Sequence, residues 1–286
     1  MLDQWPSWQH FCNLKILSIV KIDNMEIIFS LIILAFLFDF MNCAAGMGLG
    51  TSLAPILFLL GYTPLQVVPV LLIAATVSGW VSGFFHHEFE NVNFSFRPPL
   101  SKAAKVTLLI AGVGCIGIFF SVMLAYFLIK FPEVLIKTYV AVLVLFMGFI
   151  GLMSLKDIGD RKYRPKMLAG FAGLAGFNKG IGGGGYGPVV VMGEIFSGIY
   201  EKSAVGIVSL AEGIVSTVGV LTFFIIMAEG VAVDLWLLPS IFTGTFISSL
   251  IAPYMVRVFP NKVWRIIIPA YAFSIGAVFL MKIFLL

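Results

Sequence analysis

The sequence predicts an all-α polytopic membrane protein with two homologous repeats, because of its composition, its long apolar runs and its internal similarity. Of the 286 residues, 60% are hydrophobic and 11% are charged, and the mean hydropathy is +1.06. These values lie far from those of soluble domains. Because about 20 apolar residues of helix cross a bilayer, we expect about eight transmembrane helices and two short intramembrane segments interrupted by glycine.

The elements follow from the apolar runs in chain order. Residues 1–24 hold aromatic and basic side chains around a run too short to span, which predicts an interfacial segment or a leader ahead of a start at Met25. Segments too short to cross alone lie at 53–60, 167–177 and 189–196. Long spans are predicted at 27–45, 65–85, 103–127, 134–155, 204–227, 235–256 and 263–284.

Matching positions in the two halves indicate an internal duplication. Asn42 corresponds to Asn178 at an offset of 136, and Gly61 corresponds to Gly198 at an offset of 137. An even number of crossings in each half would make the repeats parallel, and an odd number would make them inverted. The predicted organisation is a repeat at 25–155, a loop at 156–166 and a second repeat at 167–286. The loop holds five basic residues and is therefore expected to be cytoplasmic.

Glycine-rich segments open both halves. The second segment reads Asn-Lys-Gly-Ile-Gly-Gly-Gly-Gly-Tyr-Gly-Pro over residues 178–188, within an otherwise apolar stretch. Consecutive glycines are poor helix formers, and irregular backbone at membrane depth persists only where it lines a cavity or packs against protein. The pattern is typical of the discontinuous helices of secondary transporters. The alternative is close helix packing through small residues.

These motifs resemble those of the TauE/SafE family of sulfite and organosulfonate transporters. The resemblance extends from about Met25 to the end of the chain. It implies passage of small sulfur-containing anions, usually outward, without an enzymatic step. The residues that carry it are Gly46-Met-Gly-Leu-Gly50 with Pro55, the segment 180–188, Glu-Asn-Val-Asn at 90–93 and Gly-Val-Ala-Val-Asp at 230–234.

An anion site at the helix breaks also follows from the residues themselves. Broken helices present unsatisfied backbone amides, and glycine allows an anion to approach them closely. Lys179 adds a positive charge at a depth where a lysine costs about 2.5 to 3.5 kcal/mol, unless it reaches the interface instead. The asparagines donate to the ligand, cap the helices, or do both. The predicted binding residues are Asn42, Gly48, Gly50, Thr51, Ser52, Asn178, Lys179, Gly182, Gly183, Gly184, Gly185 and Tyr186.

Glu212 lies well inside the span 204–227, where an acid is expected to be neutral or paired. One interpretation is a proton-coupling carboxyl, and a second is a structural partner for Lys179. The third is a protonated acid satisfied by Ser209 or Ser216. Asp39 is a weaker candidate of the same kind.

The remaining patterns narrow the function classes. The scattered cysteines and histidines predict no metal site or disulfide framework, and no cofactor or enzyme motif is found. We expect no nucleic-acid binding. The expected partners are a small anionic substrate and the lipid bilayer of the cell membrane. The sequence leaves open whether the protein forms a homo-oligomer. The alternative functions are a Na⁺- or H⁺-coupled carrier or channel that uses Glu212, and a non-transporting membrane scaffold.

Overall fold

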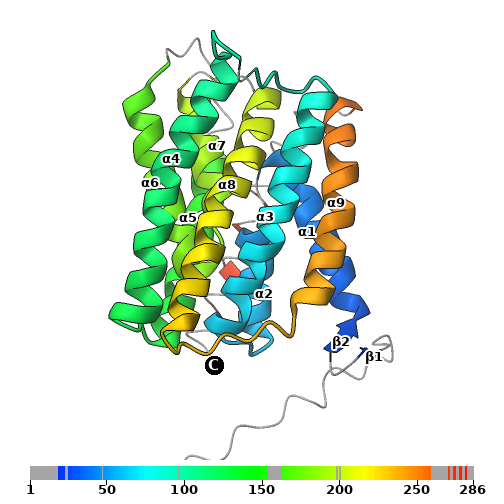
Figure 1. Ribbon diagram of the computed structural model, residues 1–286, viewed down its shortest axis with the longest axis vertical. Helices are drawn as coiled ribbons and strands as arrows, with labels where there is room; N and C mark the ends of the chain where they lie inside the picture. Colours follow the sequence, from blue (N-terminus) through cyan, green and yellow to red (C-terminus); the bar gives the residue numbers. More distant parts are fainter. Residues whose placement is uncertain are drawn as a thin grey trace, which may run out of the picture.

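A computed structural model describes most of the chain as a bundle of helices (Figure 1). The predictions for residues 1–24, for loop 156–166 and for the last span at 263–284 lie largely outside the described residues. The described residues are 19–22, 25–46, 48–95, 97–153, 163–197, 199 and 201–258, with isolated positions between 270 and 281.

A short β-hairpin precedes the helices. Strand β1 (Ile19–Ile22) pairs antiparallel with strand β2 (Met25–Ile28). Both strands contain β-branched residues, which favour extended backbone. The end of the predicted N-terminal interfacial segment is therefore strand, and the first helix begins at Phe29.

The first glycine break divides an apolar hairpin into two arms. Helix α1 (Phe29–Ala45) ends at Gly46, whose φ of +71° is a left-handed conformation that glycine adopts without strain. The chain continues through the π-helical turn η2 (Leu49–Leu53) into helix α2 (Ala54–Leu59). Helix α1 has 17 residues and rises about 26 Å. It extends from Ile28, beside Ser240 at the start of helix α9 (Leu238–Val258), to the Cys43 carbonyl oxygen, which lies 2.9 Å from His86 Nε2 near the end of helix α3 (Pro64–Glu88). The predicted span 27–45 therefore extends along most of the bundle, and the chain turns back only after it, through η2 and α2.

The second glycine break forms another hairpin. Helix α6 (Pro165–Gly182) ends at Gly183, which has a left-handed φ of +73°, and helix α7 (Tyr186–Phe196) follows. The Ser197 hydroxyl donates to the carbonyl oxygen of Arg164 at 3.4 Å. The start of α6 and the end of α7 therefore lie together, and this hairpin returns to the end of the bundle from which it entered.

Longer helices pack against the two hairpins: α1 lies along α9, and α6 lies along α4 (Lys102–Val122) at one edge of the bundle (Figure 1). By length and composition, four stretches of the described residues can cross a membrane: Pro64–Glu88, Lys102–Leu128, Ser203–Ala228 and Leu238–Val258. The total of about eight transmembrane helices stays a prediction. The longer helices are α3 (Pro64–Glu88), α4 (Lys102–Val122) with the π-helical turn η3 (Met123–Leu128), α5 (Glu133–Met153), α8 (Glu201–Ala228) and α9 (Leu238–Val258).

Hydrogen bonds at the two ends of the bundle fix the directions of α3, α8 and α9. At one end, Gln66 Nε2 near the start of α3 donates to Asp234 Oδ2, ahead of α9, at 2.9 Å. At the other end, Arg257 Nη1 near the end of α9 donates to the carbonyl oxygen of Phe89 at 2.7 Å. Helices α3 and α9 thus run in the same direction. Helix α8 runs in the opposite direction, because Gly206 near its start packs against His86 near the end of α3.

The two hairpins therefore enter from opposite ends of the bundle. The backbone N–H of Ile28, just before α1, donates to Ser240 Oγ at the start of α9 at 2.9 Å, so the first hairpin enters where α3 and α9 begin. The second hairpin enters at the end where α8 begins, because α7 leads directly into α8. The breaks meet inside the bundle.

The two breaks touch backbone to backbone. A Cβ atom on Gly50 would overlap the carbonyl oxygen of Gly183, and one on Gly184 would overlap the carbonyl oxygen of Gly50. The Gly185 N–H also donates to Thr51 Oγ1 at 3.3 Å. The glycines interrupt the helices and also permit this close approach, so the close packing through small residues is present at the breaks.

Candidate functional site

A buried ion pair lies beside the meeting point of the two breaks. Lys179, in the last turn of α6, is 1% exposed, and Glu212 in α8 is 3% exposed. Lys179 Nζ lies 2.6 Å from Glu212 Oε1. Because removing two charges from water costs several kcal/mol per ion, a pair at this depth requires close geometry and further hydrogen bonds. Lys179 is thus buried and paired, and does not reach the bundle surface.

The first half of the chain supplies the second donor to the carboxylate. Asn42, in α1, donates from Nδ2 to Glu212 Oε2 at 3.0 Å. Lys179 and Asn42 therefore hold the two carboxylate oxygens from different hairpins. Three elements distant in sequence converge on one negatively charged group.

Asn178 precedes Lys179 on α6 but faces another helix. Its Oδ1 accepts a hydrogen bond from the hydroxyl of Tyr139 in α5. Its Nδ2 is buried and has no hydrogen-bond partner among the described residues. A buried amide without a partner is costly, so this N–H group is a free donor at the break.

Tyr186 begins α7 next to the ion pair. Lys179 Nζ lies 5.8 Å from the centre of the Tyr186 ring, within the range of a cation–π contact. The Tyr186 hydroxyl is buried without a partner among the described residues. Helix α7 therefore begins at the break, and the free backbone N–H groups of its first turn favour an anion there.

The other residues predicted from the sequence do not all lie at the ion pair. Thr51 joins the two breaks through its bond from Gly185. Ser52 is buried, and its backbone N–H donates to the Gly48 carbonyl oxygen at 2.8 Å, but no side-chain contact brings it to the ion pair. Gly48 packs within its own hairpin, since a Cβ there would overlap the carbonyl oxygen of Phe38.

Two tyrosines at the break are absent from the residues predicted from sequence. Tyr139 holds Asn178, and the Tyr126 hydroxyl donates to the carbonyl oxygen of Ile181 at 2.5 Å. Both lie in predicted apolar spans, where a hydroxyl needs a partner. Polar atoms within apolar runs are the signal that would have pointed to them.

A second buried acid lies elsewhere on α1. Asp39 Oδ2 accepts hydrogen bonds from Ser78 Oγ at 2.7 Å and from Ser248 Oγ at 2.8 Å. These contacts join α1 to α3 and α9 through hydroxyl groups. Asp39 thus differs from Glu212, which is held by a lysine and an amide.

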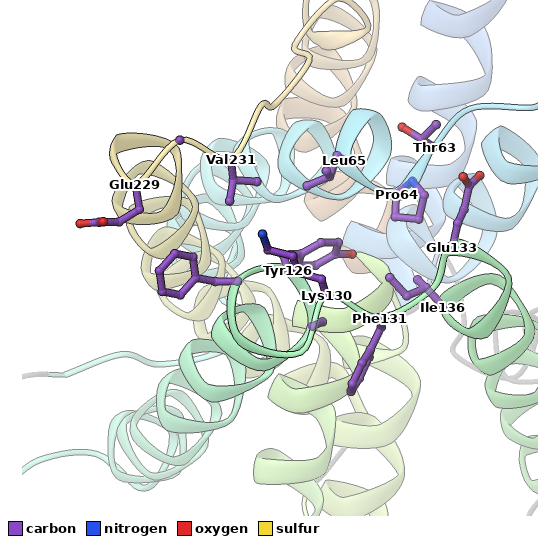
Figure 2. Close-up of a pocket in the computed structure, with 13 residues that line it drawn as sticks. Thr63, Pro64, Leu65, Tyr126, Lys130, Phe131, Glu133, Ile136, Glu229 and Val231 are labelled. Atoms are coloured by element: carbon purple, nitrogen blue, oxygen red, sulfur yellow. The ribbon is translucent and has the colours of Figure 1, made fainter.

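A cavity of about 490 Å³ opens near the start of α5 (Figure 2). Its walls come from the start of α3, from the turn between η3 and α5, and from the end of α8. Tyr126 and Ile136 line it, so the cavity borders the side chain that contacts Ile181.

The described residues contain no group of three or more His, Cys, Asp or Glu side chains that could hold a metal ion. The polar groups at the break are instead an ammonium group, amides and hydroxyls, together with the Glu212 carboxylate that accepts from Lys179 and Asn42. Broken helices that meet around a buried charge within an apolar bundle are features of secondary membrane transporters.

Comparison with known proteins defines the class more closely. The chain belongs to the TauE/SafE family, since the family model described as "Sulfite exporter TauE/SafE" matches residues 31–279. A similar protein, named "Probable membrane transporter protein YtnM" from Bacillus subtilis (strain 168), is 26% identical over 260 residues. That similarity covers 86% of this chain and 81% of the relative. No solved structure matches the chain. The chain is therefore a member of a membrane transporter family.

Proposed function

We propose that this protein is a multi-pass transporter of the cell membrane that moves sulfite or a small organosulfonate, in the outward direction, through a site at the two glycine breaks. The observation that carries the proposal is the Lys179–Glu212 pair, which is buried beside the point where the breaks meet. The family membership supports transport, and the description of the family model suggests the substrate.

Glu212 occupies the position of an anion in this site. Its carboxylate accepts from Lys179 and Asn42, which are donors that a sulfite or sulfonate oxygen would also use. The free Nδ2 of Asn178 and the start of α7 add donors that the carboxylate leaves unused. A substrate that displaces the carboxylate gains these donors as well.

We assign proton coupling to Glu212. A carboxylate displaced from Lys179 would be an unpaired buried charge, which is unfavourable. A proton on Glu212 removes that charge and leaves Lys179 free for the substrate. Anion binding and proton binding are then linked at one residue.

The directions of the helices support inverted repeats. The hairpins enter from opposite ends, and α3 and α8, which each follow a hairpin, run in opposite directions. Inverted repeats around a central site are a common basis of alternating access. If the loop 156–166 is cytoplasmic, a potential of about 100 mV, negative inside, favours exit of each negative charge by about 2.3 kcal/mol.

Flux of sulfite into and out of proteoliposomes at an imposed membrane potential tests the proposal. We expect saturable flux in the wild type that short sulfonates inhibit and that sulfate and thiosulfate inhibit less. The variant Lys179→Ala should have no flux, while Lys105→Ala, at an exposed position on α4, should retain it. A Lys179→Ala variant that folds and transports like the wild type would contradict the proposed site. A cation current that survives in it would instead favour the cation carrier.

A further inference from the structure

The cavity near the start of α5 lies at the end of the bundle opposite loop 156–166. It is bordered by Thr63, just before α3, by Glu133, the first residue of α5, and by Glu229, just after α8. Helix α5 runs from the cavity to Met153, directly ahead of the loop. Helix α8 runs toward the cavity from the other end. If the loop is cytoplasmic, the cavity opens to the outside.

Helix α5 connects this cavity to the glycine break. Ile136 lines the cavity, and four residues later Val140 contacts the position of the Gly182 Cβ atom. Tyr139, between them, donates to Asn178. Because four residues of helix rise by about 6 Å, the inner end of the cavity lies about one helical turn from the second break.

Tyr126 separates the cavity from the break. Its ring lines the cavity and lies 5.2 Å, between ring centres, from the ring of Phe223 in α8. Its hydroxyl donates to the carbonyl oxygen of Ile181 in the last turn of α6. The residue belongs to the π-helical turn η3, and such turns are frequent at functional sites.

The charge that points into the cavity is positive. Figure 2 shows the Lys130 side chain directed between Tyr126 and Val231, while the Glu229 carboxylate points away from the cavity. The other acid of the lining, Glu133, is paired with Lys137 at 2.5 Å. The acids of the lining therefore leave the charge of Lys130 uncompensated inside the cavity.

We propose that this cavity is an outer binding site for the transported anion, held by Lys130, and that Tyr126 is the barrier between it and Lys179. The proposal rests on the proposed function, since it places a second site on the path of the same anion. The Tyr126 hydroxyl must leave the Ile181 carbonyl for the passage to open, and it is then a donor to the passing anion.

The first test measures the charge preference of a thiol placed in the cavity. Ile136→Cys is introduced into a chain whose three cysteines are replaced by alanine, and it is treated with an anionic, sulfonate-bearing methanethiosulfonate and with a cationic one. We expect the anionic reagent to react about tenfold faster, ethanesulfonate to slow it, and Lys130→Gln to abolish the preference. Val134→Cys, at a 70% exposed neighbouring position, is the control that Lys130→Gln should not affect.

The second test concerns the barrier. Val140→Cys lies beyond Tyr126 and should react slowly with either reagent, and Tyr126→Ala should raise its rate at least about tenfold. The more conservative Tyr126→Phe should raise the rate of anion exchange with little change in Kd, because in the closed arrangement the hydroxyl is bonded to Ile181 and not to the bound anion. Size-exclusion profiles and thermal unfolding establish that each variant is folded.

The outcomes separate the two proposals. Equal reaction of Ile136→Cys with both reagents, without effect of Lys130→Gln or ethanesulfonate, would overturn the outer anion site. An unchanged rate at Val140→Cys in folded Tyr126→Ala would overturn the barrier. If sulfite flux is absent but the charge preference at Ile136→Cys persists, the transport proposal fails and the anion-attracting cavity stands.

Discussion

The two glycine breaks have the same backbone design but different chemistry. In the first, the left-handed Gly46 donates its N–H to the Asn42 carbonyl oxygen at 2.7 Å. In the second, the left-handed Gly183 donates its N–H to the Lys179 carbonyl oxygen at 2.8 Å. The helix ends therefore align Asn42 with Lys179, and not with Asn178 as the sequence offset of 136 predicts.

This alignment explains why the two residues meet on one carboxylate. Equivalent positions of the two hairpins are brought together when the breaks meet, and each donates to an oxygen of Glu212. One half supplies a neutral amide and the other supplies the positive charge. Duplicated backbone geometry thus places one charged donor and one neutral donor on the same carboxylate.

The largest effect is expected where the backbones of the two breaks touch. Gly50→Ala and Gly184→Ala each place a Cβ atom against backbone of the other hairpin, which cannot move aside as a side chain can. We expect loss of transport and a lower Tm in thermal unfolding followed by size-exclusion chromatography. Gly112→Ala is the control, because nothing lies within 4 Å of its added Cβ. Normal flux in a Gly50→Ala variant would show that the contact is dispensable.

The next effect concerns the charged side of the site. Lys179→Met leaves Glu212 buried without its cation, and breaking such a pair costs about 3 to 5 kcal/mol. The double variant Lys179→Met with Glu212→Gln should recover much of the stability but no sulfite flux. Chemical unfolding together with proteoliposome flux separates the two effects. Restored flux in the double variant would mean that the pair is structural.

Exchanging the aligned residues tests the comparison directly. Lys179→Asn alone should abolish flux, because no positive charge remains at the breaks. Adding Asn42→Lys restores one lysine and one asparagine around Glu212, and we expect flux at least about tenfold above the single variant. Flux measured for both variants at matched protein levels tests this expected recovery. No recovery would show that the charge must come from the second hairpin.

A smaller effect is expected at Asn178, whose Nδ2 has no partner among the described residues. If this group donates to the anion, Asn178→Ala should weaken binding by about tenfold or more, since a hydrogen bond to a charged group contributes about 1.5 to 3 kcal/mol. Tyr139→Phe is the matched control, because it removes only the bond to Asn178 Oδ1. Competition with ethanesulfonate measures the affinity of both variants for the anion. Equal losses in the two variants would assign Asn178 a structural role.

The sequence singled out the charged residues at the breaks, but it did not predict the path of the chain there. Depth and residue type sufficed to single out Lys179 and Glu212, and partnership between them was one of the interpretations considered. The turn of the chain at Gly46 was not recognised, because the residues on either side of it are as apolar as those of a crossing helix. Apolar runs report burial, and the direction in which a chain leaves a glycine break depends on backbone dihedral angles.

Contacts between segments that are distant in the chain could not be predicted from the sequence either. The placement of Tyr126 and Tyr139 depends on how α4 and α5 pack against α6, and a single sequence contains no information about such pairs. The alignment of Asn42 with Lys179 has the same origin. The sequence offers both offsets, 136 from the asparagines and 137 from Gly61 and Gly198, and only the left-handed glycines select the second.

The smallest effect is expected for Thr51, which joins the neutral break to the charged one. Thr51→Val keeps the shape of the side chain but removes the acceptor of the Gly185 N–H, at a cost of about 0.5 to 1.5 kcal/mol. Thr51→Ser keeps the acceptor and is the control. Because the bond holds the breaks together without touching Lys179, we expect a lower Tm and a changed rate of flux at unchanged affinity for ethanesulfonate. A loss of affinity that Thr51→Ser does not share would place the hydroxyl in the anion site itself, as the sequence predicted.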